Sequence, residues 1–345
     1  MRVPMSLKET DAEETPFVLD GHFDLTMDLL DRRERGERDV YRKIFEEDFA
    51  AGGVSCIFSA IFLHSHFLPE MALRKALSQI AALHEEIEES GGRVAICTTT
   101  AEIRDAVSKG RLAAVLSFEG VEPLLGDLRL LAIFHSLGVR GVGLVWSRRN
   151  EAAEGCSFHP VETGREGGLS AFGVQLVRKA ENLGMFIDVS HMNDQGFWDV
   201  MDVARGPVIA SHSNCRALCP HPRNLTDDQI RAIAAKNGVI GINALSAFVV
   251  PASEGRRAVL DDLVRHADHM AELVGTDHIG IGFDFDGKFM DYSGMGKAIE
   301  VYDVIHGHRD VPLFADALLR RGYSSSDIRK ILGMNFMRVL ENTIG

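Results

Sequence analysis

The chain has 345 residues, of which 46% are hydrophobic and 25% are charged, so it can bury the core of one large barrel or of two smaller domains. Its formal net charge is −13, and because binding to a phosphate backbone needs clustered Lys and Arg, no nucleic-acid partner is expected. The longest apolar stretch, 238–252, is interrupted by Asn243 and Ser246. It is shorter than the roughly 20 residues of a membrane span, so no membrane partner is expected either.

Residues 1–15 are acidic and lack the basic start and apolar centre of a secretory signal. We therefore expect a flexible tail, followed by a single domain over residues 16–345. The five cysteines are an odd set without a Cys-x-x-Cys pair, which argues against a disulfide framework and against a thiolate zinc site. These features predict a cytoplasmic protein. A homodimer is left open, because no sequence feature shows a self-complementary patch.

Eight short segments of β-type composition alternate with helical patterns, an order typical of βα units in a parallel sheet. The predicted strands cover residues 16–20, 53–61, 112–117, 139–145, 185–189, 207–210, 239–243 and 278–283. The helical patterns cover residues 70–89, 126–137, 168–183, 227–236, 258–274 and 311–342. The predicted fold class is α/β, with one closed (β/α)8 barrel. The charge-rich stretch 31–48 is expected to be an exposed loop or helix after the first strand.

Acidic and imidazole side chains stand just beyond several of these strands. They are His22, Asp24, Glu119, His191, His212 and Asp284. Each residue by itself is more often a capping or hydrogen-bonded structural residue than a ligand. All six, however, are predicted at the C-terminal end of the barrel, where the active sites of such enzymes lie. Their shared placement predicts a metal site.

The number of ligands predicts two ions. His22, Asp24, His191 and His212 supply two ligands for each ion, and the carboxylate of Glu119 has two oxygens with which to bridge them. Two ions about 3.5–4 Å apart can hold a hydroxide between them at neutral pH and polarise a carbonyl for attack. The predicted chemistry is hydrolysis by metal-activated water.

Six short stretches occur in the order found in one known family and cover nearly the whole chain. They are Asp-Gly-His-Phe-Asp at 20–24, Phe-Glu-Gly at 118–120, Asp-Val-Ser-His at 188–191, Ala-Ser-His-Ser at 210–213, His-Pro-Arg-Asn at 221–224 and Gly-Phe-Asp-Phe-Asp-Gly at 282–287. Through them the chain resembles the renal, or membrane, dipeptidase family of zinc peptidases, family M19. Absence of the animal enzymes' secretory features makes it similar to the bacterial members.

The resemblance implies that two zinc ions are bound at the C-terminal ends of the barrel strands. His22, Asp24 and Glu119 would bind one ion, and Glu119, His191 and His212 would bind the other. Glu119 would therefore bridge them. This implied ligand set agrees with the number of ligands counted above.

The resemblance also implies roles for an arginine and an aspartate. Arg223 would pair with the C-terminal carboxylate of a dipeptide, a task suited to the guanidinium group. Asp284 would act as acid and base, taking a proton from the attacking water and delivering it to the leaving amine, whereas Asp286 is expected to be structural. The implied substrates are dipeptides, including those with a D-residue at the second position, and some family members also open β-lactams.

Two positions depart from the family pattern. Trp146 stands after the fourth strand, where the animal enzymes carry a histidine that contacts the scissile carbonyl, so that role is not carried over. Trp146 and Asn150 are instead expected near the mouth of the barrel, where they would contact substrate. Phe23 replaces the asparagine that is usual between the first two ligands, and this leaves the ligand number unchanged.

Two other functions fit parts of the pattern. A binuclear hydrolase of the amidohydrolase type would act on a lactone, a cyclic amide or an N-acyl amino acid, but such enzymes usually begin with His-x-His and use a lysine as the bridge. A catalytically silent barrel would be expected to lack Asp284 or a ligand, and this sequence lacks none of them. The histidines not expected to bind metal include His64, His66, His159, His221 and His278.

Overall fold

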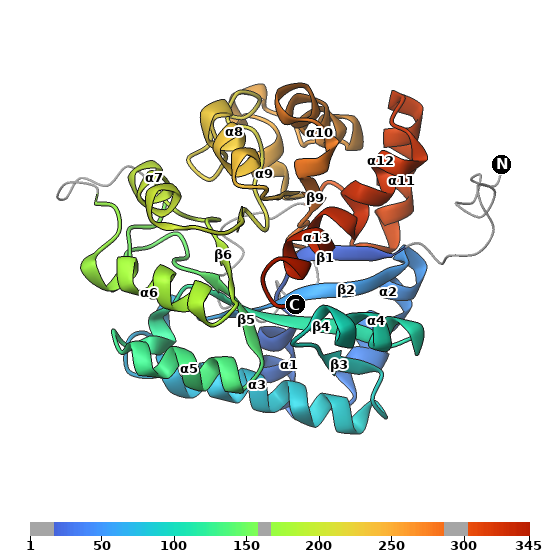
Figure 1. Cartoon of the computed structure of the whole chain (residues 1–345). Helices are drawn as coiled ribbons and strands as arrows, with labels where there is room; N and C mark the ends of the chain where they lie inside the picture. The colour runs from blue at the N-terminus through green and yellow to red at the C-terminus, as the bar shows by residue number, and fades with distance from the viewer. Residues whose placement is uncertain (1–16, 158–166, 286–302) are drawn as a thin grey trace.

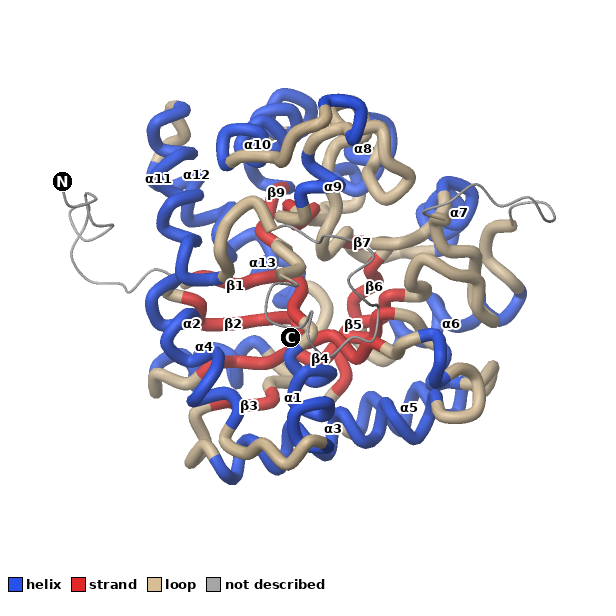
Figure 2. Tube along the Cα trace, turned by 180° about the vertical axis from the view of Figure 1, so that it is seen from behind, coloured by secondary structure: helices blue, strands red, loops and turns tan. Residues whose placement is uncertain are grey.

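The computed structural model describes residues 17–157, 167–285 and 303–345, and parallel strands ringed by helices form its centre (Figures 1 and 2). The strands are β1 Val18–Phe23, β2 Val54–Phe62, β3 Val94–Ile96, β4 Leu112–Glu119, β5 Val139–Gly143, β6 Phe186–Asp188, β7 Val208–Ile209, β8 Ile240–Ile242 and β9 Ile279–Ile281. Within the described ranges they belong to one sheet. The predicted tail 1–15, together with His159 and Asp286, lies outside the described residues.

The sheet closes into a barrel. Its strands follow the order β7-β6-β5-β4-β2-β1-β9-β8, with parallel pairing throughout. Ala210, the residue after β7, forms a parallel bridge with Ile240 of β8, which joins the two ends of that order. The eight strands on this path are the eight that the sequence predicts, so the (β/α)8 prediction is confirmed. The additional strand β3 pairs with β4 alongside the path, and at three residues it is too short to stand out in the sequence.

The helices cover the outside of the ring (Figure 2). They are α1 Leu25–Glu34, α2 Glu46–Gly52, α3 Ala72–Glu89, α4 Thr100–Ser108, α5 Leu128–Ser136, α6 Ala171–Asn182, α7 Asp194–Val203, α8 Asp227–Ala235, α9 Ser246–Val249, α10 Leu260–Val274, α11 Val311–Arg321, α12 Ser325–Arg329 and α13 Asn335–Glu341. Each predicted helical pattern corresponds to one or more of them. Among the described helices, none combines the length and apolar character needed to span a membrane.

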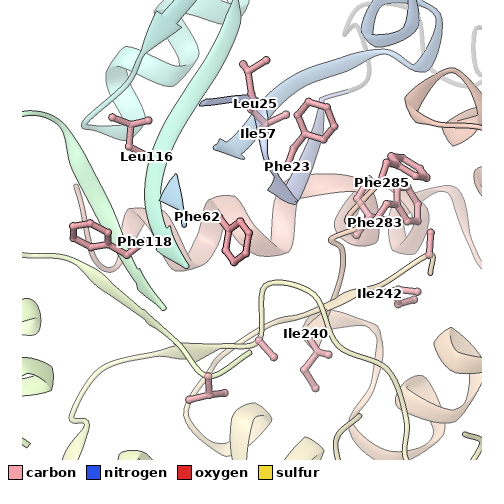
Figure 3. Packing of buried hydrophobic residues seen from close by; sticks show 14 of the residues in the cluster. Phe23, Leu25, Ile57, Phe62, Leu116, Phe118, Ile240, Ile242, Phe283 and Phe285 are labelled. Carbon is pink, nitrogen blue, oxygen red and sulfur yellow. The ribbon is translucent and has the colours of Figure 1, made fainter. Parts of the chain in front are cut away.

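Alternate strand residues pack in two separate layers. Ile57 of β2 and Leu116 of β4 belong to the large cluster between the strands and the helices, whose side chains Figure 3 shows. Their neighbours along the strands, including Phe58 and Val115, belong to a second cluster. This alternation is what a strand buried on both faces requires, because successive side chains point to opposite faces.

Three aromatic rings pack against one another in the second cluster. Phe58 stacks on Phe186 with ring centroids 4.8 Å apart and meets Phe336 of α13 edge-on at 5.2 Å. Phe336 can approach the strands because Gly21 of β1 and Gly280 of β9 lack side chains, and a Cβ atom at either position would come within 2.8 Å of its ring. This packed interior supports the strand ends that carry the site.

The charge-rich stretch 31–48 is not exposed throughout, so that prediction is wrong in part. Arg33 of α1 is buried, and its guanidinium group contacts Glu85, Glu86 and Glu89 of α3 at 2.7–3.3 Å. The pairing is between residues more than 50 positions apart, which no local charge pattern reveals. The five cysteines are free and buried, and the cytoplasmic location stays a prediction.

Candidate active site

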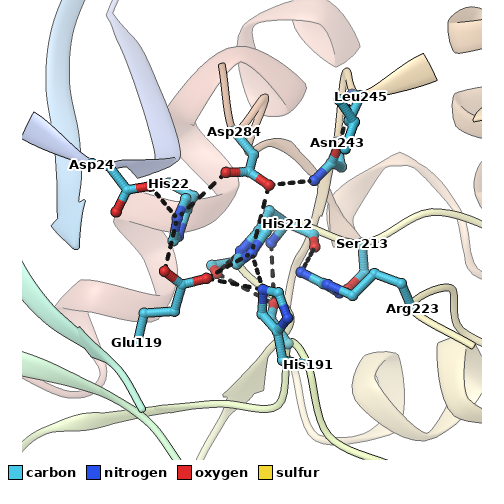
Figure 4. A network of polar contacts seen from close by, with 12 residues as sticks. His22, Asp24, Glu119, His191, His212, Ser213, Arg223, Asn243, Leu245 and Asp284 are labelled. Atoms are coloured by element: carbon cyan, nitrogen blue, oxygen red, sulfur yellow. Dashed lines mark hydrogen bonds and ion pairs between the residues drawn. The ribbon is translucent and has the colours of Figure 1, made fainter. Parts of the chain in front are cut away.

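Six side chains that the sequence singles out meet at one end of the barrel (Figure 4). They are His22, Asp24, Glu119, His191, His212 and Asp284. Two lie inside strands, not just beyond them as predicted: His22 is the penultimate residue of β1, and Glu119 is the last residue of β4. β4 extends this far because both neighbours pair with it, and Glu119 itself is in register with β2 and with β5. The end of β1 is paired with β2, through Phe23 and Ser59.

Glu119 divides its two oxygens between the histidines. Its Oε2 lies 3.7 Å from Nε2 of His22, while its Oε1 lies 2.9 Å from Nε2 of His191 and 3.6 Å from Nε2 of His212. All three imidazoles thus present Nε2 to the same carboxylate. The rings of His22 and His212 also lie with centroids 3.8 Å apart and are tilted by 32°, which brings the two predicted groups of ligands together.

Two aspartates complete the surroundings of His22. Its Nε2 lies 4.0 Å from Asp24 Oδ2 and 3.6 Å from Asp284 Oδ1. The buried atoms His22 Nε2 and Asp24 Oδ1 have no hydrogen-bond partner. A buried polar atom without a partner is costly unless something else satisfies it, and nitrogen and oxygen donors suit a zinc ion. The residues therefore fit a bound cation.

Two overlapping triads have the spacing for a metal ion: His22 with Glu119 and His212, and His22 with Asp24 and Asp284. They share members and cut across the two ligand sets that the family resemblance implies. The assignment of individual ligands to individual ions therefore stays a prediction.

Burial dominates the electrostatics of the cluster. It lowers the pKa of His22 to about 3 and the pKa values of His191 and His212 well below the ordinary value, so these imidazoles are neutral and keep a lone pair for a ligand. Burial, together with repulsion between the carboxylates, raises the pKa values of Asp24 and Glu119 well above their usual range. A divalent cation would relieve this crowding of negative charge.

Asp284 has a raised pKa of about 7, which is chiefly a result of burial. The positive charge of Arg223 and a hydrogen bond from Asn243 act in the opposite direction. Its backbone adopts a φ of 57°, a left-handed conformation that is uncommon for residues other than glycine. The surrounding structure therefore holds this residue in an unfavourable conformation.

Hydroxyl groups bind the imidazole nitrogens that face away from Glu119. Nδ1 of His212 lies 2.7 Å from Ser211 Oγ, which in turn donates a hydrogen bond to Asp188 Oδ2. Nδ1 of His191 lies 2.8 Å from Ser147 Oγ. Such partners orient a ligating histidine and select its tautomer.

Asp20 joins two of the strand ends that carry the site. Its Oδ1 accepts hydrogen bonds from the backbone N–H groups of His22 and Phe283, and its Oδ2 lies 2.7 Å from Nε2 of His308. Asp20 and Asp188 occur within the family stretches of the sequence, but no role was predicted for either of them. The available signal was an aspartate at a strand position that is otherwise apolar, close before a histidine.

Arg223 is buried beside the cluster. Its Nη1 donates to Ser213 Oγ at 2.7 Å and its Nη2 donates to the carbonyl oxygen of His212 at 2.5 Å. Its Nε is buried without a hydrogen-bond partner. A buried guanidinium group with an unused donor suits an anionic ligand such as a carboxylate.

The side chains of Trp146 and Asn150 make different kinds of contact. The ring of Trp146 lies 5.8 Å from that of His191, at the edge of the cluster. The amide of Asn150 is used within its own loop: it donates to the carbonyl oxygen of Leu144 and accepts from the backbone N–H of Ala152. Substrate contact stays a prediction for both residues.

The other described histidines have local partners or lie apart from the triads. His221 Nδ1 accepts the backbone N–H of Arg223, and His278 Nδ1 lies 2.9 Å from the carbonyl oxygen of Gly238. Neither they nor His64 and His66 belong to the groups with metal-ion spacing.

Comparison with known proteins agrees with this geometry. A family model described as membrane dipeptidase (peptidase family M19) matches residues 9–344. A metallo peptidase from Rhodobacter sphaeroides, solved with a phosphinate mimic of the dipeptide L-Ala-D-Ala, is 30% identical with a TM-score of 0.83; the match covers 96% of this chain and 100% of that chain. The dipeptidase AC, a metallo peptidase of family M19, is 31% identical with a TM-score of 0.84 over the same shares of both chains.

A sequence relative from Klebsiella pneumoniae, described as an uncharacterized protein in the pqqA 5′ region, is 37% identical over 76% of this chain and 94% of its own length. The family match covers nearly the whole sequence, and the two structural matches cover nearly the whole fold. The chain therefore belongs to the membrane dipeptidase family, peptidase family M19, and is a metallo-dipeptidase.

Proposed function

We propose that the protein is a zinc-dependent dipeptidase that uses two zinc ions bridged by Glu119, with Asp284 as the general acid and base. The observation that carries the proposal is the division of Glu119, with one oxygen toward His22 and the other toward His191 and His212. A carboxylate placed between two sets of neutral imidazoles can ligate one ion with each oxygen.

His22, Asp24 and Glu119 would hold one zinc ion, and Glu119, His191 and His212 would hold the other. The unpartnered atoms of His22 and Asp24 and the neutral imidazoles support this assignment. When bound, the two ions would lower the pKa of a water molecule and polarise the scissile carbonyl.

Side chains of the protein bind the substrate and transfer the proton. Arg223 binds the C-terminal carboxylate of the dipeptide, and its burial strengthens this pairing because little water screens it. Asp284, whose Oδ1 lies 3.6 Å from His22 Nε2, is close enough to the ligands to accept a proton from the attacking water and return it to the leaving amine.

The proposed substrates are dipeptides with free termini, including those with a D-residue at the second position. The inclusion of D-residues is supported by the ligand of the Rhodobacter sphaeroides relative, which is a mimic of L-Ala-D-Ala.

Amine release from a panel of L,L and L,D dipeptides tests the proposal, with zinc-loaded protein, chelated protein and the Asp284→Asn variant in parallel. We expect turnover that depends on zinc and a kcat for Asp284→Asn lower by about 10²–10⁴-fold at unchanged zinc content, because the amide cannot exchange the proton. Turnover of N-acyl amino acids or lactones but of no dipeptide would instead favour an amidohydrolase-type activity. A wild-type rate no greater than that of Asp284→Ala would indicate a catalytically silent barrel.

A further inference from the structure

We propose that Asn243 is a positioning residue for Asp284, holding one carboxyl oxygen so that the other faces the reacting atoms. This inference rests on the proposed role of Asp284 as acid and base. Asn243 directly follows β8, whereas Asp284 lies beyond the neighbouring strand β9. The family motifs recognised in the sequence do not include Asn243.

The two side chains are in direct contact (Figure 4). Asn243 Nδ2 donates a hydrogen bond of 2.9 Å to Asp284 Oδ2. The other oxygen, Oδ1, lies 3.6 Å from Nε2 of His22. Oδ2 also lies 3.9 Å from Nε2 of His212, so the amide holds the oxygen on the His212 side while Oδ1 faces His22.

The orientation of the Asn243 amide is determined by a second contact. Its Oδ1 accepts the backbone N–H of Leu245 at 2.7 Å. Since a backbone N–H can only donate, the oxygen end of the amide must face Leu245, and the NH2 end must face Asp284. Asp284 Oδ2 therefore accepts from the amide, which occupies one of its lone pairs and favours Oδ1 as the oxygen that exchanges the proton with substrate.

Asn243 is itself held rigidly. Its backbone N–H donates to Asn214 Oδ1 at 3.2 Å, and Asn214 Nδ2 donates back to its carbonyl oxygen at 2.9 Å. Both asparagines are buried. A terminal carboxyl torsion has a broad energy minimum, so without this rigid donor the Asp284 carboxyl group would sample other orientations. A displacement of a catalytic group by about 1 Å can lower the reaction rate about 100-fold.

Steady-state kinetics of two variants on a dipeptide test the inference. Asn243→Leu has a similar volume but lacks the donor, and Asn243→Asp keeps an acceptor for Leu245 while replacing the donor with a carboxyl oxygen. For each we expect kcat to fall about 10–100-fold while KM stays within about twofold, at unchanged zinc content.

Asn335→Leu is the matched control. Asn335 is also buried, and its Nδ2 donates to the carbonyl oxygens of Thr276 and Ile279, near the end of β9 remote from Asp284. Loss of this amide is expected to lower Tm and to leave kcat unchanged. The comparison separates a loss of stability from a loss of positioning.

A double-mutant cycle decides whether Asn243 acts through Asp284. In the Asp284→Asn background, Asn243→Leu is expected to lower kcat by less than about twofold, because the group that it positions is already absent. A loss of equal size in both backgrounds would overturn the inference. Wild-type kcat in Asp284→Asn alone would instead overturn the proposed function.

If Asn243→Leu fails to fold, as judged from Tm and zinc content, the double-mutant cycle with Asp284→Asn is carried out with Asn243→Asp instead. Wild-type kcat in folded, zinc-loaded Asn243→Asp would contradict the inference.

Discussion

The two histidines of the site that follow β6 and β7 are oriented by hydrogen bonds to the ring nitrogen that faces away from Glu119. Ser211 binds Nδ1 of His212 and donates to Asp188, so the imidazole keeps its proton on Nδ1 and its lone pair on Nε2, which faces Glu119. Ser147 holds the corresponding nitrogen of His191. The metal affinity of the site should therefore depend on residues that never touch an ion.

Ser211→Ala is expected to weaken zinc binding by about 10–100-fold, because His212 loses the acceptor that selects its tautomer. Competition with a chelator of known affinity measures this change. Ser59→Ala is the matched control, since Ser59 Oγ is buried without a hydrogen-bond partner. Equal zinc affinity in wild type and Ser211→Ala would contradict the role given to Ser211.

At the scale of elements, α10 is tied to the loops on its side of the barrel by one buried histidine. His266 Nδ1 accepts the backbone N–H of Cys215, which lies beyond β7, and its Nε2 donates to the carbonyl oxygen of Val249 at the end of α9. The contact with Cys215 requires the neutral ring, because a protonated Nδ1 would face a donor, whereas Nε2 can donate to Val249 in either state. Burial lowers the pKa of His266 to about 4.

This lowered pKa predicts a loss of stability in acid. The unfolded chain takes up a proton near pH 6.5 but the folded chain only near pH 4, so the free energy of unfolding falls as pH decreases between these values and is unaffected above them. The difference corresponds to about 3 kcal/mol. Urea unfolding at pH 7.5 and pH 4, with chelator present, should show a loss smaller by about this amount in His266→Gln. Identical pH dependence of the two proteins would mean that folding does not lower the pKa of His266.

At the scale of the whole molecule, the site exists only when the barrel is closed. The predicted ligands come from the end of β1 and the residue after it, from β4 and from the loops after β6 and β7, which are far apart in the chain. The barrel interior beneath them is packed by Phe58, Phe186 and Phe336, the last from the C-terminal helix. An ion bound by all of these elements binds the folded chain in preference to the unfolded one, so it stabilises the fold.

Removal of metal should therefore lower the melting temperature. Two ions, each present at about 1,000 times its Kd, would stabilise the fold by about 8 kcal/mol, which corresponds to a fall in Tm on the order of 10 °C or more after chelation. Differential scanning calorimetry before and after chelation measures it. Glu119→Gln, which lacks the bridging carboxylate, should show a smaller fall. An unchanged Tm after verified metal loss would mean that the ions do not couple to folding.

The eight barrel strands and the ends that carry the candidate ligands were predictable from the sequence. Strands buried on both faces are nearly continuous apolar runs, and a polar residue at the end of such a run marks the edge of the sheet. Parallel strands of a barrel bring all their C-terminal ends to one face, so six polar residues far apart in the sequence could be placed together before any coordinates were known.

Only the tertiary structure decided which atoms face one another and which residues support them. Asp20 and His308 are in contact although they are 288 positions apart in the sequence. Asn243, which follows β8, contacts Asp284, which follows the neighbouring strand β9. Likewise, the buried pairing of Arg33 depends on where α3 packs against α1. Local patterns report which face of an element is buried, whereas hydrogen-bond partners depend on side-chain orientation and on the closing of the barrel, and these arise only when distant segments pack together.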